Sequence, residues 1–429
     1  MSDIFSDLRW RGLVHQTTDD SHVPAWLAGG SRTVYAGFDP TADSLHVGHL
    51  MGLLTLRRFQ GAGHRPIALL GGATGMIGDP SGKSEERNLL SVEALEHNVS
   101  AIRSQMEMLL DFNPGKKNAA VLVNNFDWMR QFSYLDFLRE IGKNFPVNVM
   151  LAKDSVRSRL EESSAGMSYT EFSYMLLQAY DFVELFAKFQ CELQIGGSDQ
   201  WGNITAGIDL ARRMKGVQLY GLTWPLLLKS DGSKMGKTES GALWLSSART
   251  TPYTFYQYWI NVDDADAGKS LRFLTELAHE EIEALDAARA ADPAKRESQR
   301  RLAEELTRLI HGESGLAAAR RATEFFFGAE ITDASDAQLN EIFADVASRE
   351  VPRSRLEGDG LNIADALELA GLAKSKSEAR RTVEQGGAYV NNRRVEGIAT
   401  QLTARDLASK SVMVLRSGKK KYALLRFCK

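Results

Sequence analysis

Two histidines, His46 and His49, stand at the predicted start of a helix, with Gly48 between them. Residues 33–38 before them have the β-branched and aromatic side chains of a short strand, and leucines recur at helical spacing after them until Gly61. Where a strand of a parallel sheet is followed by a helix, the free N–H groups and positive dipole end of that helix favour phosphate. The pattern therefore indicates a nucleotide site in which Gly48 leaves room for the ligand, although two such histidines could equally cap a helix and fill a core.

Two lysines, Lys234 and Lys237, lie three residues apart in a predicted loop that contains Gly232 and Gly236. Lysines on a mobile loop suit a clamp on a polyphosphate, because their ammonium groups stabilise charge that grows on phosphate oxygens. Taken alone, the same pattern would also describe an ordinary exposed lysine loop.

A third set of polar residues falls on a helix that is otherwise apolar nearly all round, over residues 171–183. Tyr174, Gln178 and Asp181 share one face of that helix, and a buried amide or carboxylate needs hydrogen-bond partners. The face either belongs to an internal hydrogen-bond network or lines a polar pocket for a small ligand.

Two aspartates follow predicted strands. Asp79 lies in a glycine-rich run, residues 71–83, whose spacing does not match a P-loop, and it could bind an ammonium at the rim of the same crevice. Asp199 follows the strand predicted over residues 193–197, where an aspartate is well placed to bind a ribose hydroxyl.

The elements that must position these residues follow one another as strand, helix and strand, which predicts a right-handed βαβ unit and a parallel sheet. A third buried strand is expected over residues 119–123, and residues from about 251 to 350 have helical periodicity throughout. Pro352, Gly358 and Gly360 among charged residues indicate a linker, and a compact unit of two helices and short strands follows it.

Composition and charge place further bounds on the molecule. The 429 residues are enough for about three domains, and no apolar run approaches the ~18 residues of a membrane span. The first residues lack the pattern of a signal peptide, and two cysteines are too few for a disulfide framework or a cysteine zinc site, so we expect a cytoplasmic protein. Residues 374–429 hold 14 Lys and Arg against 4 Asp and Glu, while the remainder holds 38 against 51. This asymmetry indicates a polyanion bound at one end, unless the basic segment is only a solvated tail.

Together these motifs resemble those of the class I aminoacyl-tRNA synthetases, and specifically the bacterial type of tyrosyl-tRNA synthetase. Residues 40–49 look like the HIGH region of that family, and residues 234–238 look like its KMSKS loop, with Gly236 and Thr238 in place of the two serines. The segments 71–83, 178–181 and 196–203 are similar to blocks specific for tyrosine, and the basic end is similar to a small ribosomal-protein RNA-binding module. Ala36 and Gly52 depart from some relatives, which leaves the nucleotide affinity open.

The resemblance implies an α/β fold with a Rossmann-like parallel-sheet catalytic domain over residues 1–247. An α-helical domain of the anticodon-binding type is implied over 248–350, a linker over 351–360 and a basic RNA-binding domain over 361–429. It also implies a homodimer.

The implied reaction is attack of the carboxylate of L-tyrosine on the α-phosphate of ATP, followed by transfer of tyrosine to the 3′ end of tRNA(Tyr). ATP is then a substrate that carries Mg²⁺, and the catalytic residues would be donors around the triphosphate: Thr41, His46, His49, Lys83, Arg87, Lys234 and Lys237. The tyrosine phenol would meet Tyr35 and Asp181, its ammonium Asp79, Tyr174 and Gln178, and its carboxylate Gln200. Further ATP contacts would come from Asp39, Gly48, Gly197, Asp199 and Lys237.

Two alternatives stay open from the sequence. A tryptophanyl-tRNA synthetase is the nearest enzyme, but an indole N–H gives less reason for both Tyr35 and Asp181. A non-catalytic RNA-binding protein on a synthetase scaffold would have no need to retain His46, His49 and the two lysines.

Overall fold

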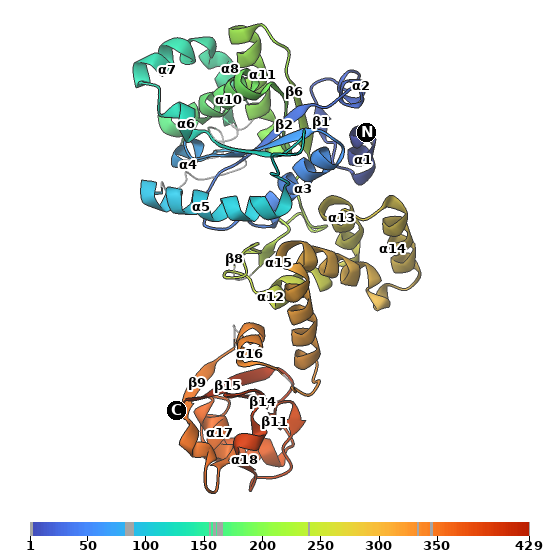
Figure 1. Cartoon of the computed structure of the whole chain (residues 1–429), viewed down its shortest axis with the longest axis vertical. Helices are drawn as coiled ribbons and strands as arrows, with labels where there is room; N and C mark the ends of the chain where they lie inside the picture. The colour runs from blue at the N-terminus through green and yellow to red at the C-terminus, as the bar shows by residue number, and fades with distance from the viewer. Residues whose placement is uncertain are drawn as a thin grey trace. The chain divides into compact units, whose positions relative to one another are not determined.

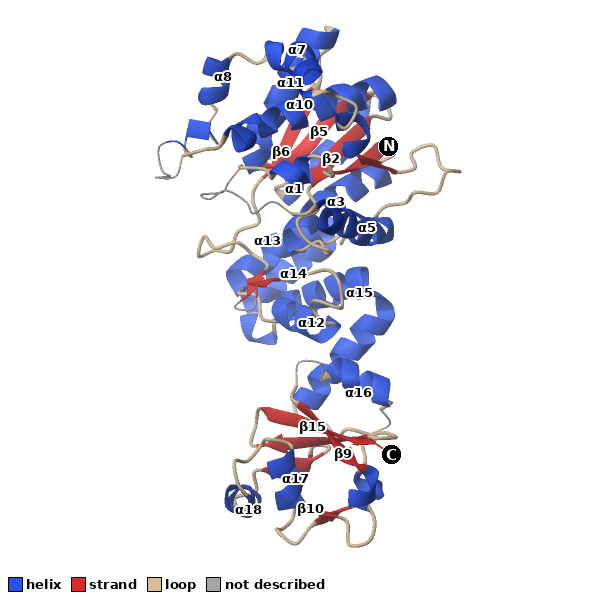
Figure 2. Ribbon diagram, turned by 90° about the vertical axis from the view of Figure 1, so that its left-hand side faces the viewer, coloured by secondary structure: helices blue, strands red, loops and turns tan. Residues whose placement is uncertain are grey.

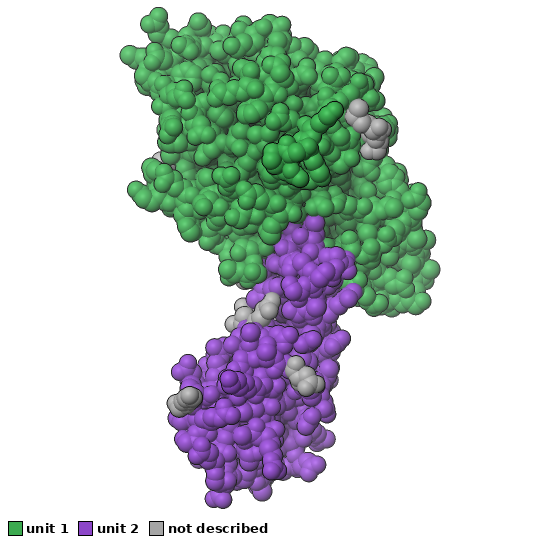
Figure 3. Space-filling model, in the orientation of Figure 1, with its two compact units in different colours: residues 1–249, 260–306 green, residues 250–259, 307–429 purple. Residues whose placement is uncertain are grey.

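The computed structural model describes residues 3–81, 90–153, 156–157, 160, 166–238, 241–332, 334–343 and 346–428. The chain forms two compact units (Figure 3). Unit 1 contains residues 1–249 and 260–306, and unit 2 contains residues 250–259 and 307–429. No described helix is long and apolar enough to cross a membrane.

A six-stranded sheet forms the centre of unit 1, in the order β1-β6-β5-β2-β3-β4 (Figure 1). Its strands are β1 (Gln16–Thr17), β2 (Thr33–Phe38), β3 (Arg65–Leu70), β4 (Val121–Asn124), β5 (Cys191–Gly197) and β6 (Tyr220–Trp224). All neighbours from β4 to β6 pair in parallel, and only the short edge strand β1 is antiparallel. The predicted parallel sheet is confirmed. The strand order reverses between β2 and β5, and such a switch point is where open α/β sheets bind ligands.

Helices cover both faces of this sheet (Figure 2). The helices α3 (Val47–Gly61) and α5 (Val92–Leu109) lie on one face, and α10 (Tyr169–Phe189) and α11 (Trp201–Lys215) lie on the other. The last two approach closely at Gly207, where an added Cβ would stand 3.2 Å from the ring of Phe182. Leucine and phenylalanine side chains at helical spacing are therefore buried on both sides of strands that are themselves apolar.

The other elements of unit 1 are short or lie beyond the sheet. They are α1 (Ile4–Arg11), α2 (Val23–Ala28), α4 (Thr74–Ile77), α6 (Phe126–Met129), α7 (Tyr134–Glu140), η1 (Gly142–Asn144), α8 (Val147–Leu151), η2 (Ser198–Gln200), β7 (Lys237–Thr238), β8 (Gly241–Ala242), α13 (Asp264–Leu274), α14 (His279–Ala291) and η3 (Pro293–Lys295).

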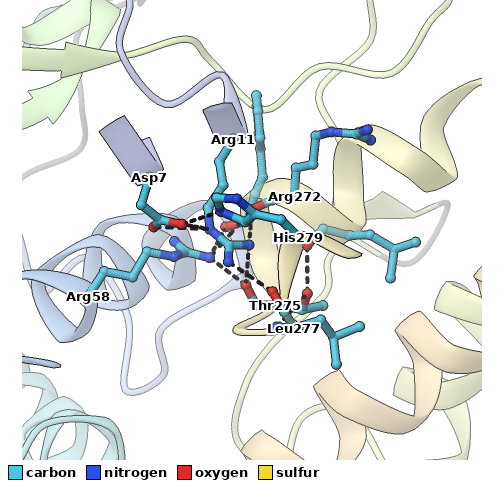
Figure 4. A network of polar contacts seen from close by, with 9 residues as sticks. Asp7, Arg11, Arg58, Arg272, Thr275, Leu277 and His279 are labelled. Carbon is cyan, nitrogen blue, oxygen red and sulfur yellow. Dashed lines mark hydrogen bonds and ion pairs between the residues drawn. The ribbon is translucent and has the colours of Figure 1, made fainter. Parts of the chain in front are cut away.

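A network of buried arginines ties α1 and α3 to the segment that joins α13 and α14 (Figure 4). Arg11 donates to the carbonyl oxygens of Thr275 at 3.2 Å and Leu277 at 2.9 Å, and it pairs with Asp7 at 3.0 Å. Arg58 of α3 donates to the carbonyl of Thr275 at 2.7 Å. These bonds satisfy backbone carbonyls of the segment that follows α13.

The helix α15 (Glu297–Phe326) begins in unit 1 and ends in unit 2, and Gly312 interrupts it with φ 71°. Unit 2 also contains α12 (Pro252–Ile260) up to residue 259 and α16 (Asp336–Ile342). Its five-stranded sheet has the order β12-β11-β14-β15-β9. The remaining elements of unit 2 are β9 (Ser348–Pro352), η4 (Arg353–Leu356), β10 (Leu361–Asn362), α17 (Ile363–Leu369), α18 (Lys376–Glu384), β11 (Ala388–Val390), β12 (Arg393–Arg394), β13 (Gln401–Leu402), η5 (Ala404–Asp406), β14 (Val412–Ser417) and β15 (Lys421–Cys428).

The predicted linker over residues 351–360 is wrong. Residues 348–352 form β9, which pairs in parallel with β15, and Val351 and Leu356 are buried in the core of that sheet. Pro352 is tolerated because it ends an edge strand. Gly358 and Gly360 have positive φ, so they make a turn inside the unit.

The predicted helical region 248–350 is not one compact body. Residues 260–306 belong to unit 1, while the rest of it belongs to unit 2. Within unit 2, Phe325 and Phe343 share a core with Val414 and Leu424 of the basic region. The predicted boundaries of the catalytic, helical and basic domains therefore stay predictions.

Candidate active site

A cavity of about 280 Å³ opens at the carboxyl ends of β2 and β5. Thirteen of the residues predicted for the site line it: Tyr35, Asp39, His46, Gly48, His49, Asp79, Tyr174, Gln178, Asp181, Gly197, Asp199, Gln200 and Lys234. Thr41 and Lys237 are not among its lining residues. Lys83 and Arg87 lie outside the described residues.

The most buried lining side chains are Tyr35 and Asp181, each 1% exposed. The carboxylate of Asp181 accepts hydrogen bonds from Trp128 Nε1 at 2.8 Å and from Asn125 Nδ2 at 3.0 Å. Burial raises the pKa of Asp181 to about 8, although these two hydrogen bonds act in the opposite direction.

The hydroxyl of Tyr35 is buried and has no hydrogen-bond partner among the described residues. Burial, with the nearby charge of Asp181, raises the pKa of Tyr35 well above its usual value, so the hydroxyl keeps its proton. An unpaired buried hydroxyl is costly unless a ligand supplies the partner. This end of the cavity therefore fits a ligand with a polar tip.

A second network surrounds Asp39, which follows β2. Its carboxylate accepts from Thr74 Oγ1 at 2.8 Å and from the Tyr174 hydroxyl at 3.1 Å. Asn125 donates to the hydroxyl of Thr74 at 3.0 Å, so this network reaches Asp181 through Asn125. Gly71 makes room for it, because a Cβ there would lie 2.1 Å from the Asp39 carboxylate.

The amides of Gln200 and Asn203 contact the carboxylate of Asp79, and the amide of Gln178 contacts Gln200. Gln200 Nε2 donates to Asp79 Oδ2 at 2.7 Å, and Asn203 Nδ2 lies 3.4 Å from Oδ1. Gln178 Nε2 donates to Gln200 Oε1 at 3.3 Å. Carboxylate and amide oxygens together suit a cationic group such as an ammonium.

The two histidines cap α3. Nδ1 of His46 accepts the N–H of Gly48 at 3.0 Å, and Nδ1 of His49 accepts the N–H of His46 at 3.3 Å. Because both Nδ1 atoms accept, each neutral ring carries its proton on Nε2 and can donate from there. Gly48 is needed beneath the ring of His46, since a Cβ would stand 2.9 Å from its Cε1.

The lysine loop, residues 229–238, joins the site through Lys234. Met235 is buried, and the left-handed Gly236 lies against Val47 at the start of α3, where a Cβ would come within 3.1 Å. Lys237 begins β7, which pairs with β8. The lysine loop thus packs against the first turn of α3, the helix that His46 and His49 cap.

The residues beside the predicted ribose position are closely packed. A Cβ on Gly197 would stand 2.7 Å from Asp199 Oδ1, and one on Gly196 would stand 3.0 Å from Cβ of Gln200. These glycines let the backbone of β5 approach the side chains of the helical turn η2 that follows it.

The residues at or next to the cavity that the sequence did not predict include Thr74, Asn125, Trp128, Gln194 and Asn203. Gln194 carried a usable signal, because it is an amide inside an apolar strand, and its Oε1 is buried without a partner in the described structure. Asn125 follows β4 at the same edge of the sheet, where polar residues meet. Trp128 had no such signal.

The cavity thus combines three features: a buried polar end formed by Tyr35 and Asp181, acceptors for a cation, and hydrogen-bond donors from two imidazoles and a lysine. Among the described residues, no group of three or more His, Cys, Asp or Glu side chains could hold a metal ion. The arrangement suits the positioning of an amino acid against a phosphate better than acid–base chemistry.

Comparisons with known proteins identify the family of the chain. The family of tRNA synthetases class I (W and Y) matches residues 28–328, and the tyrosine–tRNA ligase SYY-like C-terminal domain matches residues 342–425. A tyrosine–tRNA ligase of Rhodopirellula baltica is 60% identical over 99% of this chain and 96% of that protein. One of Roseiflexus castenholzii is 53% identical over 99% of this chain and 100% of that protein. The crystal structure of a C-terminally truncated mitochondrial tyrosyl-tRNA synthetase from Aspergillus nidulans superposes with a TM-score of 0.67 at 30% identity, covering 76% of this chain and 94% of that one.

Proposed function

Because the chain belongs to the class I tRNA synthetases and within them to the tyrosyl-tRNA synthetases, we propose that its cavity between β2 and β5 forms tyrosyl-adenylate. The chain is a tyrosine–tRNA ligase: it activates L-tyrosine with ATP, releases pyrophosphate, and transfers tyrosine to tRNA(Tyr). The two alternatives, a tryptophanyl enzyme and a non-catalytic RNA-binding protein, are thereby set aside.

The observation that carries the assignment of the pocket is the unpaired hydroxyl of Tyr35 beside the carboxylate of Asp181. The phenol hydroxyl of tyrosine would donate a hydrogen bond to Asp181 and accept one from the hydroxyl of Tyr35. Phenylalanine would leave the buried hydroxyl of Tyr35 without a partner and would offer no donor to Asp181, and such a site rejects the ligand that lacks the hydroxyl.

The amino group of tyrosine would lie among Asp79, Tyr174 and Gln178. The carboxylate of Asp79 supplies the charge, and the hydroxyl of Tyr174, which donates to Asp39, keeps lone pairs to accept from the ammonium. Gln200 would then lie beside the tyrosine carboxylate. Its amide already bonds Asp79, so the ammonium and carboxylate sites are linked.

The nucleotide would lie along the edge formed by Asp39, Gly48, Gly197 and Asp199, with its phosphates toward His46, His49 and Lys234. A tyrosine carboxylate is already a nucleophile and needs no general base, so these donors act by stabilising charge that grows on the phosphates. Thr41, Lys83, Arg87 and Lys237 complete the proposed set. For Thr41 and Lys237 this requires that their loops approach bound ATP, since neither lines the cavity.

Mg²⁺ enters this scheme as part of the substrate. Bound to the phosphates of ATP, it would neutralise charge on the departing pyrophosphate. No cluster of metal ligands among the described side chains competes for that role.

A homodimer is also proposed, on the basis of apolar side chains at the surface of unit 1. Tyr134 and Leu135 of α7, Val147 of α8 and Tyr169 of α10 are 65%, 69%, 60% and 61% exposed. Exposed apolar groups on neighbouring elements favour contact with a partner of the same kind. We place the dimer in the cytoplasm, where tRNA is charged, with the basic region of unit 2 on the tRNA backbone.

Tyrosine-dependent exchange of pyrophosphate into ATP tests this assignment. We expect exchange with tyrosine and very little with phenylalanine or tryptophan at equal concentration. Equal rates with tyrosine and phenylalanine would remove the proposed role of Tyr35 and Asp181.

A further inference from the structure

The lysine loop is anchored on α13 by a buried aspartate. Asp266, in the first turn of that helix, is 3% exposed. Its Oδ1 accepts the backbone N–H of Ser230 at 2.8 Å, and its Oδ2 lies 3.4 Å from the Ser230 hydroxyl. Ser230 stands four residues before Lys234, so this carboxylate fixes the start of the segment that bears the lysine.

The same helix holds the loop at two more points. Lys269 Nζ donates to the carbonyl oxygen of Leu228 at 3.3 Å, and Ser270 Oγ lies 3.4 Å from Sδ of the buried Met235. These contacts lie on both sides of Lys234. The backbone at that lysine is therefore held between fixed points on one helix face.

The other end of α13 is fixed to the histidine helix. Arg58, in the last turn of α3, donates from Nη2 to the carbonyl oxygens of Phe273 at 3.1 Å and Thr275 at 2.7 Å (Figure 4). The first turn of α3 carries His46 and His49. The helix α13 thus joins the element that presents the imidazoles to the loop that presents the lysine.

We propose that Asp266 is a positioning residue for adenylate formation, which sets the place of Lys234 relative to the two histidines. It touches neither the cavity nor a reacting atom, and it acts through the backbone of Ser230. The inference rests on the proposed role of Lys234 at the phosphates. A displacement of about 1 Å in such a group can lower a rate by ~100-fold.

The alternative is that Asp266 only stabilises the fold. A structural role would lower the melting temperature and the affinity for tyrosine together with the rate. A positioning role lowers the rate constant of adenylate formation alone, because tyrosine binds to β2 and α10, which Asp266 does not contact in the described structure.

The first experiment compares Asp266→Ala with the unaltered enzyme and with Asp266→Asn, whose Oδ1 can still accept the N–H of Ser230. In Asp266→Ala we expect the pre-steady-state rate of adenylate formation to fall by about 10- to 100-fold, with the dissociation constant of tyrosine changed less than about twofold, and in Asp266→Asn we expect most of the rate to be retained. Asp264→Asn is the matched control, because Asp264 lies on the same helix turn and accepts from Gln299 at 2.5 Å instead of from the loop. An unchanged rate in Asp266→Ala would overturn the proposal, as would an equal loss of tyrosine affinity in that variant.

A double-mutant cycle then separates this inference from the role of Lys234 itself. If Asp266 acts through Lys234, adding Asp266→Ala to Lys234→Ala should lower the rate by less than about twofold. If the rate losses of the two single variants multiply in the double variant, the positioning role of Asp266 is overturned and the phosphate role of Lys234 is retained. A Lys234→Ala variant with the normal rate would instead refute the phosphate role of Lys234.

Discussion

Asp181 is a buried carboxylate whose hydrogen-bond partners come from a distant part of the chain. The sequence indicated its face of the helix, because a polar face on an apolar helix needs partners. It did not indicate Asn125 and Trp128, since residues more than fifty positions away meet Asp181 only when β4 and α10 are assembled. Lys83 and Arg87, both predicted for the phosphates, lie outside the described residues.

The raised pKa of Asp181 predicts how pH affects stability. The folded protein holds this proton up to about pH 8, whereas an unfolded chain loses it near the ordinary value of 3.8. The protonation of Asp181 therefore makes its full contribution to the free energy of unfolding below pH 4. This contribution declines as pH rises to 8, by at most about 1.4 kcal/mol per pH unit.

Asp181→Asn should remove this dependence. Its amide leaves either Trp128 or Asn125 without an acceptor, which lowers stability at every pH by the same amount. From pH 5 to pH 8 the unaltered protein should lose this stability and the variant should not, so the free energy of unfolding of the variant should rise relative to that of the unaltered protein. Urea unfolding at both pH values measures this difference. A difference that is constant with pH would contradict the buried, protonated state.

Among the elements of unit 1, strands β2, β4 and β5 and helices α3 and α10 were predicted, because their apolar spacing matches the period of each element. Segments with proline and glycine were not. Pro352, Gly358 and Gly360 look like a linker in sequence, yet β9 is held by pairing with β15, which lies more than seventy residues later. Local composition cannot reveal such long-range pairing.

The crossing of α10 and α11 supports the tyrosine pocket, since α10 carries Tyr174, Gln178 and Asp181. Gly207→Val should press on Phe182 and cost about 1–3 kcal/mol of unfolding free energy. It should also weaken tyrosine binding, because α10 must shift. Urea unfolding and a fluorescence titration with tyrosine would measure both effects.

Gly202→Ala on the same helix is the control, since its nearest neighbour would be Lys153 Cδ at 3.9 Å. It should leave stability and tyrosine affinity unchanged or slightly improved. If Gly207→Val behaved like this control, the close crossing would not determine the geometry of the pocket.

At the scale of the whole molecule, every residue that lines the cavity belongs to unit 1, and the basic segment belongs to unit 2. A chain that ends at Glu350 should therefore keep pyrophosphate exchange near the full-length rate but fail to charge tRNA. It should also bind a hydrophobic dye, because Phe325 and Phe343 lose their contacts with Val414 and Leu424. Efficient charging, or the absence of dye binding, would contradict this division.

Tyr35→Phe tests whether Tyr35 and Asp181 recognise the phenol hydroxyl of tyrosine. The hydroxyl of Tyr35 has no partner in the described structure, so its removal should not lower the melting temperature. The measurement is the ratio of kcat/KM for tyrosine over phenylalanine in pyrophosphate exchange. We predict that the variant lowers this ratio by roughly tenfold, the value of about one hydrogen bond. An unchanged ratio in a stably folded variant would contradict recognition of the tyrosine phenol by Tyr35.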